Sequence, residues 1–228
     1  MKKASFFRLI ALLAFFSLNF VQVSLSAQNT WGVRVGTQFC SFRSTSKDLE
    51  GMQKPSPKLL VAVPLTFGVS DNFAVQIEPS FVQKGTKIVF NGTESGVAYS
   101  GVITSTLNYL ELPMLARFNF GRPTARFGIV VGPTVGYGLS GKNKTVITVK
   151  DKVTTNSENV GFGKDSYQRT DIGLAIGFGV QLANGLGLDV RYARGMKNLA
   201  AKEPTQTEKF YNNGVQLAMS YVLPMGGH

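Results

Sequence analysis

Large apolar residues occupy every second position over most of the chain beyond residue 30, and small or polar residues fill the positions between them. Within 127–139, for instance, Phe127 and Ile129 alternate with Gly128 and Val130. A period of two places successive side chains on opposite faces of a β-strand. The alternation predicts eight strands, at 31–40, 59–69, 73–78, 110–118, 127–139, 172–182, 186–192 and 215–223.

The connections between these strands alternate strictly in length, beginning with a long one. Three are tight turn sequences, at 70–72, 121–124 and 183–185. Four are long polar segments, at 43–57, 85–105, 141–168 and 193–209. This order predicts an all-β fold: an eight-stranded antiparallel up-and-down transmembrane β-barrel with three short periplasmic turns and four long extracellular loops. Both chain ends then fall on the periplasmic side.

The two faces of the predicted strands differ in composition. One is nearly all large and apolar, whereas the other collects Gly, Ala, Ser, Thr, Gln and almost every charged residue of the strands. The chain has 25 glycines among 228 residues and only 16% charged residues, whereas soluble domains average about 7% and about 25%. Small residues suit the crowded interior of a narrow barrel, so we expect the large apolar face to meet lipid.

Two other arrangements fit parts of the pattern. A soluble exported lipocalin-like barrel that binds a ligand would turn its large apolar residues inward, but glycines such as Gly128 and Gly132 are unusual on a water-facing strand. The uncharged segment 172–188 contains a small-xxx-small motif typical of packed transmembrane helices, but Asn184 and Gly185 interrupt it. The alternation favours the membrane barrel, and dependence on detergent distinguishes it from the soluble one.

The first residues of the chain have the order of an export signal. A basic start is followed by the apolar run 9–16 and then by small residues that end near Ala27. This order predicts a cleaved signal peptide over residues 1–27 and an outer-membrane barrel domain over 28–228. Cleavage after Ser26 and cleavage after Ala27 both fit. The peptide carries three cations and no acid, so export lowers the net charge from +11 to about +8.

The inward positions of the predicted strands collect seven charges. Isolated charges in a narrow tube are costly, so these side chains should pair with one another. We interpret the network as a plug that stiffens the lumen, with a polar path or small-ligand site as the alternative. Eight-stranded barrels seldom hold an open pore, so we expect no continuous channel, and a narrow pore or transporter is the competing interpretation. The members are Arg34, Glu78, Glu111, Arg117, Arg126, Asp189 and Arg191.

Basic residues are frequent in the long polar segments, and those beside the strand ends would lie at the outer rim. Lys142, Lys144, Arg194 and Lys197 are the candidates for contacts with the phosphates of lipopolysaccharide. An ordinary solvated loop surface is the alternative. Nucleic acid is not an expected partner, because exported loops rarely meet it and aromatic residues do not alternate with the basic ones.

Residue types that support catalysis are scarce. The only histidine, His228, is the last residue, and the only cysteine, Cys40, ends the first predicted strand as a lone thiol. Ser–His and Asp–His mechanisms need a histidine held against the nucleophile or the attacking water. No nucleotide-binding loop and no metal-ligand spacing is visible. We therefore expect a non-enzymatic protein that needs no cofactor and no metal.

Several strand segments resemble the PorT-like outer membrane beta-barrel family. Residues 73–85 are similar to its third strand, and Leu107-Asn108-Tyr109-Leu110-Glu111-Leu112-Pro113 is similar to its fourth. Gly132-Pro133 with Gly136-Tyr137, and Asp171-Ile172-Gly173, fit the later strands. The resemblance implies a barrel in a Gram-negative outer membrane and supplies no catalytic residue. Because the namesake acts in assembling the type IX secretion apparatus, the resemblance also implies a structural or accessory role in the envelope, with other envelope or secretion proteins as partners. We expect a monomeric barrel.

Overall fold

The computed structural model describes residues 29–44, 51–163, 167–200 and 209–225, and the predicted signal peptide lies outside them. The described chain forms one antiparallel sheet of thirteen strands, which confirms the predicted all-β antiparallel class. No helix in these four ranges is long and apolar enough to cross a membrane. The strands are β1 (Thr30–Ser44), β2 (Gln53–Lys54), β3 (Ser56–Ala62), β4 (Leu65–Gly68), β5 (Phe73–Ile77), β6 (Ser80–Lys84), β7 (Lys87–Glu94), β8 (Val97–Arg122), β9 (Ala125–Val149), β10 (Lys152–Val160), β11 (Thr170–Leu182), β12 (Leu186–Gly195) and β13 (Phe210–Pro224).

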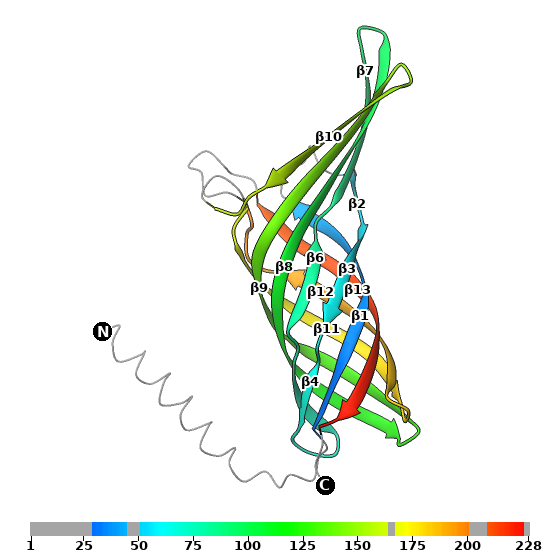
Figure 1. Cartoon of the computed structure of the whole chain (residues 1–228), viewed down its shortest axis with the longest axis vertical. Helices are drawn as coiled ribbons and strands as arrows, with labels where there is room; N and C mark the ends of the chain where they lie inside the picture. The colour runs from blue at the N-terminus through cyan, green and yellow to red at the C-terminus, as the bar shows by residue number, and fades with distance from the viewer. Residues whose placement is uncertain (1–28, 45–50, 164–166, 201–208, 226–228) are drawn as a thin grey trace, which may run out of the picture.

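The strand pairings form a closed circuit. β1 pairs with β13 on one side and with β3 and β4 on the other. β3 pairs with β6 and β4 with β5, and both β5 and β6 pair with β8. β8 continues through β9, β11 and β12 back to β13. Counting β3 with β4 and β5 with β6 as single interrupted strands, the circuit passes through eight positions, and Figure 1 shows the strands arranged around a common axis.

Two of the barrel strands are interrupted at prolines. The predicted continuous strand 59–69 divides at Val63 and Pro64, and the predicted strand 73–78 continues as β6 after a break at Glu78 and Pro79. Proline has no amide hydrogen and so cannot donate to a sheet ladder. Its carbonyl still accepts, and the Val63 amide donates to the Pro79 oxygen at 2.9 Å. The inward and outward alternation is therefore kept across both breaks.

The three predicted tight turns lie at one end of the barrel. The first closes with the Val69 and Ser70 amides donating to the Phe73 oxygen. Gly121 and Gly185 have φ of +107° and +87° in the other two, a conformation that side chains with a Cβ rarely adopt. The start of β1 and the end of β13 reach the same end in Figure 1, which we call the turn end.

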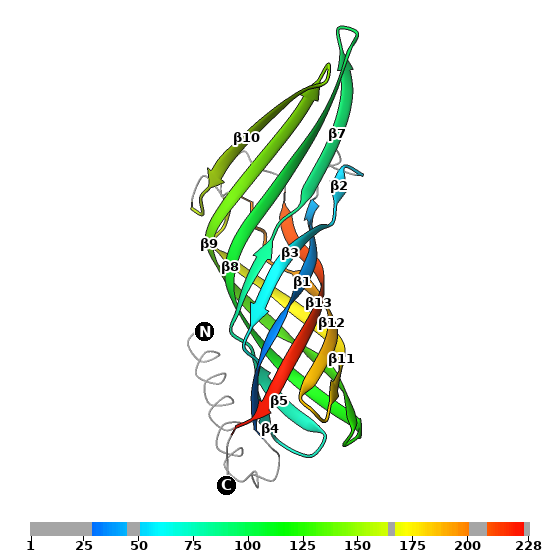
Figure 2. The ribbon, with the colours of Figure 1, turned by 45° about the vertical axis from the view of Figure 1, so that its right-hand side comes forward.

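Two of the predicted long loops are mostly β-structure, which corrects the sequence prediction. Segment 85–105 contains β7 and the first part of β8, joined by a tight turn with Ser95 and Gly96 at positive φ. Segment 141–168 contains the end of β9 and all of β10, joined through Lys150 and Asp151, also at positive φ. Figures 1 and 2 show these two hairpins extending the barrel wall beyond the end opposite the turns, which we call the hairpin end.

The outer surface of the barrel is apolar, as the alternation predicted. Leu110, Ile176 and Leu188 are exposed by 54%, 54% and 49%, and similar residues follow every strand of the circuit. Along β9 this face runs from Phe127 to Leu139, about 40 Å of strand at about 3.3 Å per residue. A tilt of about 40° reduces this to a height of about 30 Å, which matches the hydrocarbon thickness of a bilayer.

Candidate functional site in the lumen

Four of the predicted inward charges form one buried group, the turn-side cluster of Arg34, Glu78, Asp189 and Arg191. They come from β1, the β5–β6 junction and β12, which lie on different sides of the lumen. Arg34 Nη1 lies 3.1 Å from Glu78 Oε1, and Arg34 Nη2 lies 2.7 Å from Asp189 Oδ1. Arg191 Nη1 lies 2.9 Å from Glu78 Oε2. Two acids and two bases thus tie three sides of the tube together.

Hydrogen bonds hold the side chains of the turn-side cluster in place. Arg34 Nε donates to Asp189 Oδ2 at 2.9 Å while Nη2 donates to Oδ1, a bidentate fork. Arg191 Nε lies 3.0 Å from Asp189 Oδ1, an ion-pair distance without hydrogen-bond geometry. Gln76 and Gln216 occupy remaining sites, with Gln76 Nε2 donating to Glu78 Oε2 at 2.6 Å and Arg34 Nη2 donating to Gln216 Oε1 at 3.1 Å. Charges buried this deeply are tolerated because nearly every polar atom has a partner.

A second buried group, the hairpin-side cluster of Lys84, Glu111, Asp171 and Asn212, lies nearer the hairpin end. Lys84 Nζ donates to Glu111 Oε2 and, at 3.0 Å, to Asp171 Oδ2. Asn212 Nδ2 donates to the same Asp171 oxygen at 2.8 Å. The Lys84 ammonium also lies 5.2 Å from the centre of the Tyr109 ring, within the range of a cation–π contact. One cation here serves two carboxylates.

Apolar and aromatic side chains fill the lumen around the hairpin-side cluster. Val82, Leu107 and Tyr109 are completely buried and pack with Phe42 and Leu60. Toward the hairpin end, Tyr109 contacts Phe162 edge-on with ring centres 5.5 Å apart, and Phe42 contacts Tyr167 at 5.9 Å. Burial raises the pKa of Tyr167, so its hydroxyl stays neutral in this packing.

Lys84 and Asp171 are not among the inward charges that the alternation predicts. Lys84 lies at the end of β6, beyond the predicted strand 73–78 and before the predicted loop 85–105. Asp171 directly precedes the outward Ile172, so extending the alternation by one residue would have placed it in the lumen. Glu111, by contrast, was assigned inward correctly, but its partner is Lys84 rather than an arginine.

Arg117 and Arg126 lie apart from both clusters. Arg117 is half-buried and donates to three amide oxygens, those of Asn119 at 2.8 Å, Gln76 at 3.1 Å and Gln181 at 3.4 Å. Arg126 is exposed at the turn end of β9, where it pairs with Gly121. Neither arginine makes an ion pair within the part of the chain that the structure describes. The expectation that all seven inward charges pair is therefore wrong for these two.

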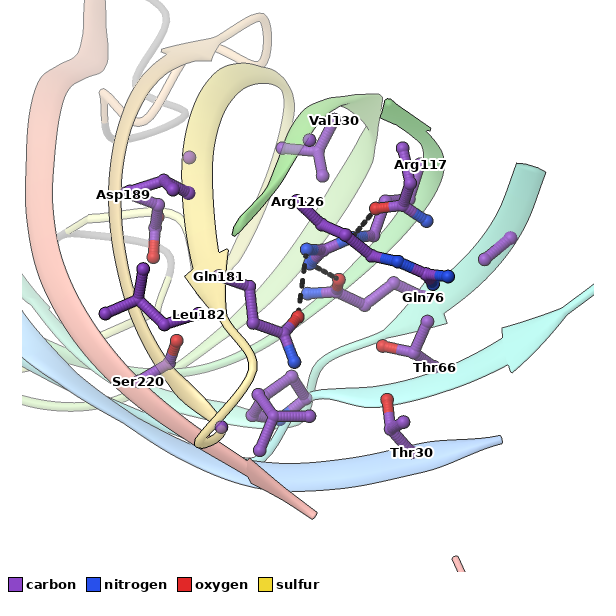
Figure 3. Close-up of a pocket in the computed structure, with 18 of the residues that line it drawn as sticks. Thr30, Thr66, Gln76, Arg117, Arg126, Val130, Gln181, Leu182, Asp189 and Ser220 are labelled. Carbon is purple, nitrogen blue, oxygen red and sulfur yellow. Dashed lines mark hydrogen bonds between the residues drawn. The ribbon is translucent and has the colours of Figure 1, made fainter. Parts of the chain in front are cut away.

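Below the turn-side cluster the lumen holds a polar cavity of about 720 Å³. Its lining includes residues of all three tight turns and of both ends of the barrel chain, so the cavity extends to the turn end. Figure 3 shows Arg117, Arg126, Gln76 and Gln181 around it, with Arg117 hydrogen-bonded to both glutamines. Arg34, Asp189 and Arg191 also contribute to the lining.

The four basic residues predicted for the rim lie beyond the apolar band. A register shift between Asn108 and Tyr109 of β8 makes Leu139 of β9 an extra residue, a β-bulge that inverts the alternation. Lys142 and Lys144 consequently project from the outer face, and both are exposed. Arg194 is exposed in line with the outward Tyr192, and Lys197 donates to the Thr170 hydroxyl on the same rim.

No group of three or more metal-ligating residues occurs among the described residues. Cys40 is a buried free thiol. His228 lies outside the described residues. The polar lumen is therefore the candidate functional site.

A closed antiparallel barrel with an apolar exterior and a charged lumen has the architecture of an outer-membrane β-barrel. The family model for "Outer membrane protein beta-barrel domain" matches residues 22–201. The chain belongs to this family of outer-membrane β-barrel proteins. No curated protein matches the sequence.

Among solved structures, the chain has low similarity to several outer-membrane proteins. Ail, the attachment invasion locus protein of Yersinia pestis, is 13% identical with a TM-score of 0.40, over 86% of this chain and 100% of Ail. The protein OprG of Pseudomonas aeruginosa is 10% identical with a TM-score of 0.37, over 86% and 96%. The protease OmpT of Escherichia coli is 8% identical with a TM-score of 0.42, over 90% and 100%.

Proposed function

We propose that this chain is an eight-stranded transmembrane barrel of a Gram-negative outer membrane, with a non-enzymatic structural or accessory role in the envelope. The observation that carries the proposal is the distribution of side chains around the closed circuit. A continuous apolar band faces outward, and two ion-paired clusters occupy the interior. Backbone groups pair around the circuit, which is the condition for strands to lie in lipid. The turn end is assigned to the periplasm and the hairpin end to the exterior.

Aromatic residues support this placement. Phe120, Phe127 and Phe178 stack on one another with ring centres 5.8–6.5 Å apart near the turn end of the band. Phe73 and Phe118 form a neighbouring pair at 5.1 Å. Such girdles mark the interfaces of transmembrane barrels. We assign the membrane border on the side of the turn end to the level of these aromatic residues.

Basic residues support the opposite border. Lys142 and Lys144 on β9, together with Lys87 on β7, project from one outer face, since Lys87 and Lys144 both pair with Thr104. Arg43 lies 4.7 Å from the centre of the Tyr211 ring on another side of the barrel. Cations beside aromatic rings just above an apolar band suit the phosphates of outer-membrane lipid and lipopolysaccharide. We assign these lipids as partners and propose that the barrel is monomeric.

The packed lumen favours a closed barrel over a pore. Lys84, Leu107 and Tyr109 are at most 5% exposed, and the turn-side cluster crosses the lumen below them. The PorT-like strand motifs direct the accessory role toward protein secretion. A gene deletion scored for the export of secreted proteins tests that assignment, and normal export in the deletion strain would contradict it.

Membrane insertion is tested by fractionation and by a gel assay of heat modifiability. The mature chain should remain with the outer membrane until detergent is added. Unboiled protein should migrate differently from boiled protein, because a folded barrel resists the gel detergent. Recovery in the detergent-free periplasmic fraction would instead support the soluble ligand-binding barrel. Glu158→Gln, an exposed change on β10, should match the wild type in both assays.

A further inference from the structure

The cavity at the turn end carries positive charge that no ion pair among the described residues neutralises. Four arginines contribute to its lining, Arg34, Arg117, Arg126 and Arg191, against the acids Asp71 and Asp189. Arg34 and Arg191 are held by Asp189 and by Glu78 at the roof of the cavity. Arg117 and Arg126 have no ion-pair partner among the described residues, and the remaining acid of the lining is the exposed Asp71 in the first tight turn.

Arg117 is held in place without being neutralised. Amide oxygens of Gln76, Asn119 and Gln181 accept from its three nitrogens, so the guanidinium is oriented but keeps its full charge. Gly128 makes room for it, because a Cβ at that position would come within 3.2–3.4 Å of the guanidinium. A structural ion pair would require a carboxylate at this point, and the sequence places amides there instead.

Arg126 adds a second guanidinium on the adjacent strand. Both side chains belong to the β8–β9 hairpin, in which Gly121 pairs with Arg126 and Asn119 pairs with Gly128. Figure 3 shows both arginines at the cavity, with Gln76 and Gln181 facing them. Arg126 is exposed and free to move onto a bound group, whereas Arg117 is fixed.

We propose that this cavity is a binding site for a small anion that presents a carboxylate or phosphate group to Arg117 and Arg126. Two guanidinium forks match the planar or tetrahedral oxygens of such groups. The volume of about 720 Å³ admits a metabolite-sized ligand. The turn-side cluster closes the roof, so the site is a blind pocket entered from the turn end and not part of a channel. Only the assignment of that end to the periplasm rests on the proposed function.

The test uses the mature barrel refolded in detergent micelles and labelled with 15N. Inorganic phosphate and succinate serve as separate probes, and the signal followed is the Arg117 Nε–Hε resonance. We expect saturable shifts of this resonance with at least one probe, and the stronger of the two identifies the preferred group. Arg126→Gln, followed on the same resonance, should weaken binding at least about tenfold, the loss typical of one charge-assisted hydrogen bond.

Further variants separate binding from folding. Arg117→Gln removes the observed group, so its binding is followed by calorimetry and should also fall at least about tenfold, with Arg117→Lys between it and the wild type. Lys152→Gln, an exposed cation on β10 at the other end of the barrel, is the matched control and should bind like the wild type. Each variant is first checked for heat modifiability. If neither probe binds, or if Arg126→Gln binds as well as the wild type, the proposal is overturned, whether or not the barrel inserts into membranes.

Discussion

The two ends of the lumen both bury ion pairs but use the space around them differently. At the hairpin end, one lysine serves two carboxylates inside a packed group that includes Leu107 and Tyr109. At the turn end, two arginines and two carboxylates balance each other, and an open polar cavity follows. Side chains close the lumen completely at the hairpin end. At the turn end the ion-paired cluster also closes the lumen, but it borders a solvated pocket that carries unpaired positive charge.

The difference shows which features of a charge network indicate structure and which indicate binding. In the two clusters, charged side chains pair with side chains of opposite charge. Arg117, only a few residues along β8 from Glu111, is held by neutral amides. An ion pair neutralises its members, whereas amide support orients a charge and leaves it available to a ligand.

The largest expected effect comes from removing the shared cation of the hairpin-side cluster. Lys84→Met leaves Glu111 and Asp171 buried without a counter-charge, which should destabilise the barrel by about 3–5 kcal/mol. Urea unfolding in micelles measures this, with the fluorescence of Trp31, the single tryptophan, as the probe. Trp31 lies on the apolar exterior and should shift when it leaves the detergent.

Combining Lys84→Met with Glu111→Gln tests the cause. The pair should be less destabilised than the sum of the two single variants, because each change removes part of the imbalance left by the other. Strict additivity would show that the loss at Lys84 comes from packing and not from charge.

The next largest effect is expected in the turn-side cluster. Glu78 is 1% exposed and accepts from Arg34, Arg191 and Gln76. Glu78→Gln keeps the shape but removes the charge, and Asp189 still compensates part of it, so the loss should be smaller, about 2–3 kcal/mol. The same urea assay measures it, and Glu158→Gln on the exposed strand β10 should change stability by less than about 0.5 kcal/mol. A loss at Glu78 larger than that of Lys84→Met would reverse the ranking of the two clusters.

The alternation in the sequence was sufficient to predict which strand faces point into the lumen. Five of the seven charged residues that it places there form ion pairs, as expected. Arg34, Glu78, Glu111, Asp189 and Arg191 all lie in buried ion pairs. Alternation works here because lipid and lumen demand opposite chemistry of neighbouring residues. Arg117 and Arg126 face the cavity and make no ion pair among the described residues, because alternation predicts the direction of a side chain but not its depth along the barrel.

The hairpins could not be predicted by the same rule. Beyond the apolar band both faces of a strand meet water, so β7 and β10 lose the contrast on which the rule depends. No pattern in the sequence predicts the bulge at Leu139, although this bulge makes Lys142 and Lys144 point outward. The cavity depends on how far side chains reach across the barrel, which strand pattern alone does not determine.

A smaller effect on stability should distinguish the packed part of the lumen from the cavity. The test makes the same substitution, alanine to leucine, at one position in each region. Ala218 is 2% exposed in the packed group with Phe42 and Leu60, whereas Ala183 is exposed where the third tight turn borders the cavity. Ala218→Leu should cost about 1–3 kcal/mol through overpacking. Ala183→Leu should change stability by less than about 1 kcal/mol, because the larger side chain extends into open space. Equal losses in the urea assay would show that the cavity wall is as tightly packed as the rest of the lumen.

The smallest expected effect concerns ion conduction, because the turn-side cluster and the packed side chains at the hairpin end each block the lumen. In planar bilayers the wild type should show no stable single-channel conductance. The double variant Asp189→Ala with Arg191→Ala opens the roof of the cavity but leaves Lys84, Leu107 and Tyr109 in place, so it should also show none. Variants are compared with the wild type at equal protein and salt. Stable conductance steps confined to the double variant would mean that the turn-side cluster is the only barrier, and that the packed hairpin end admits ions.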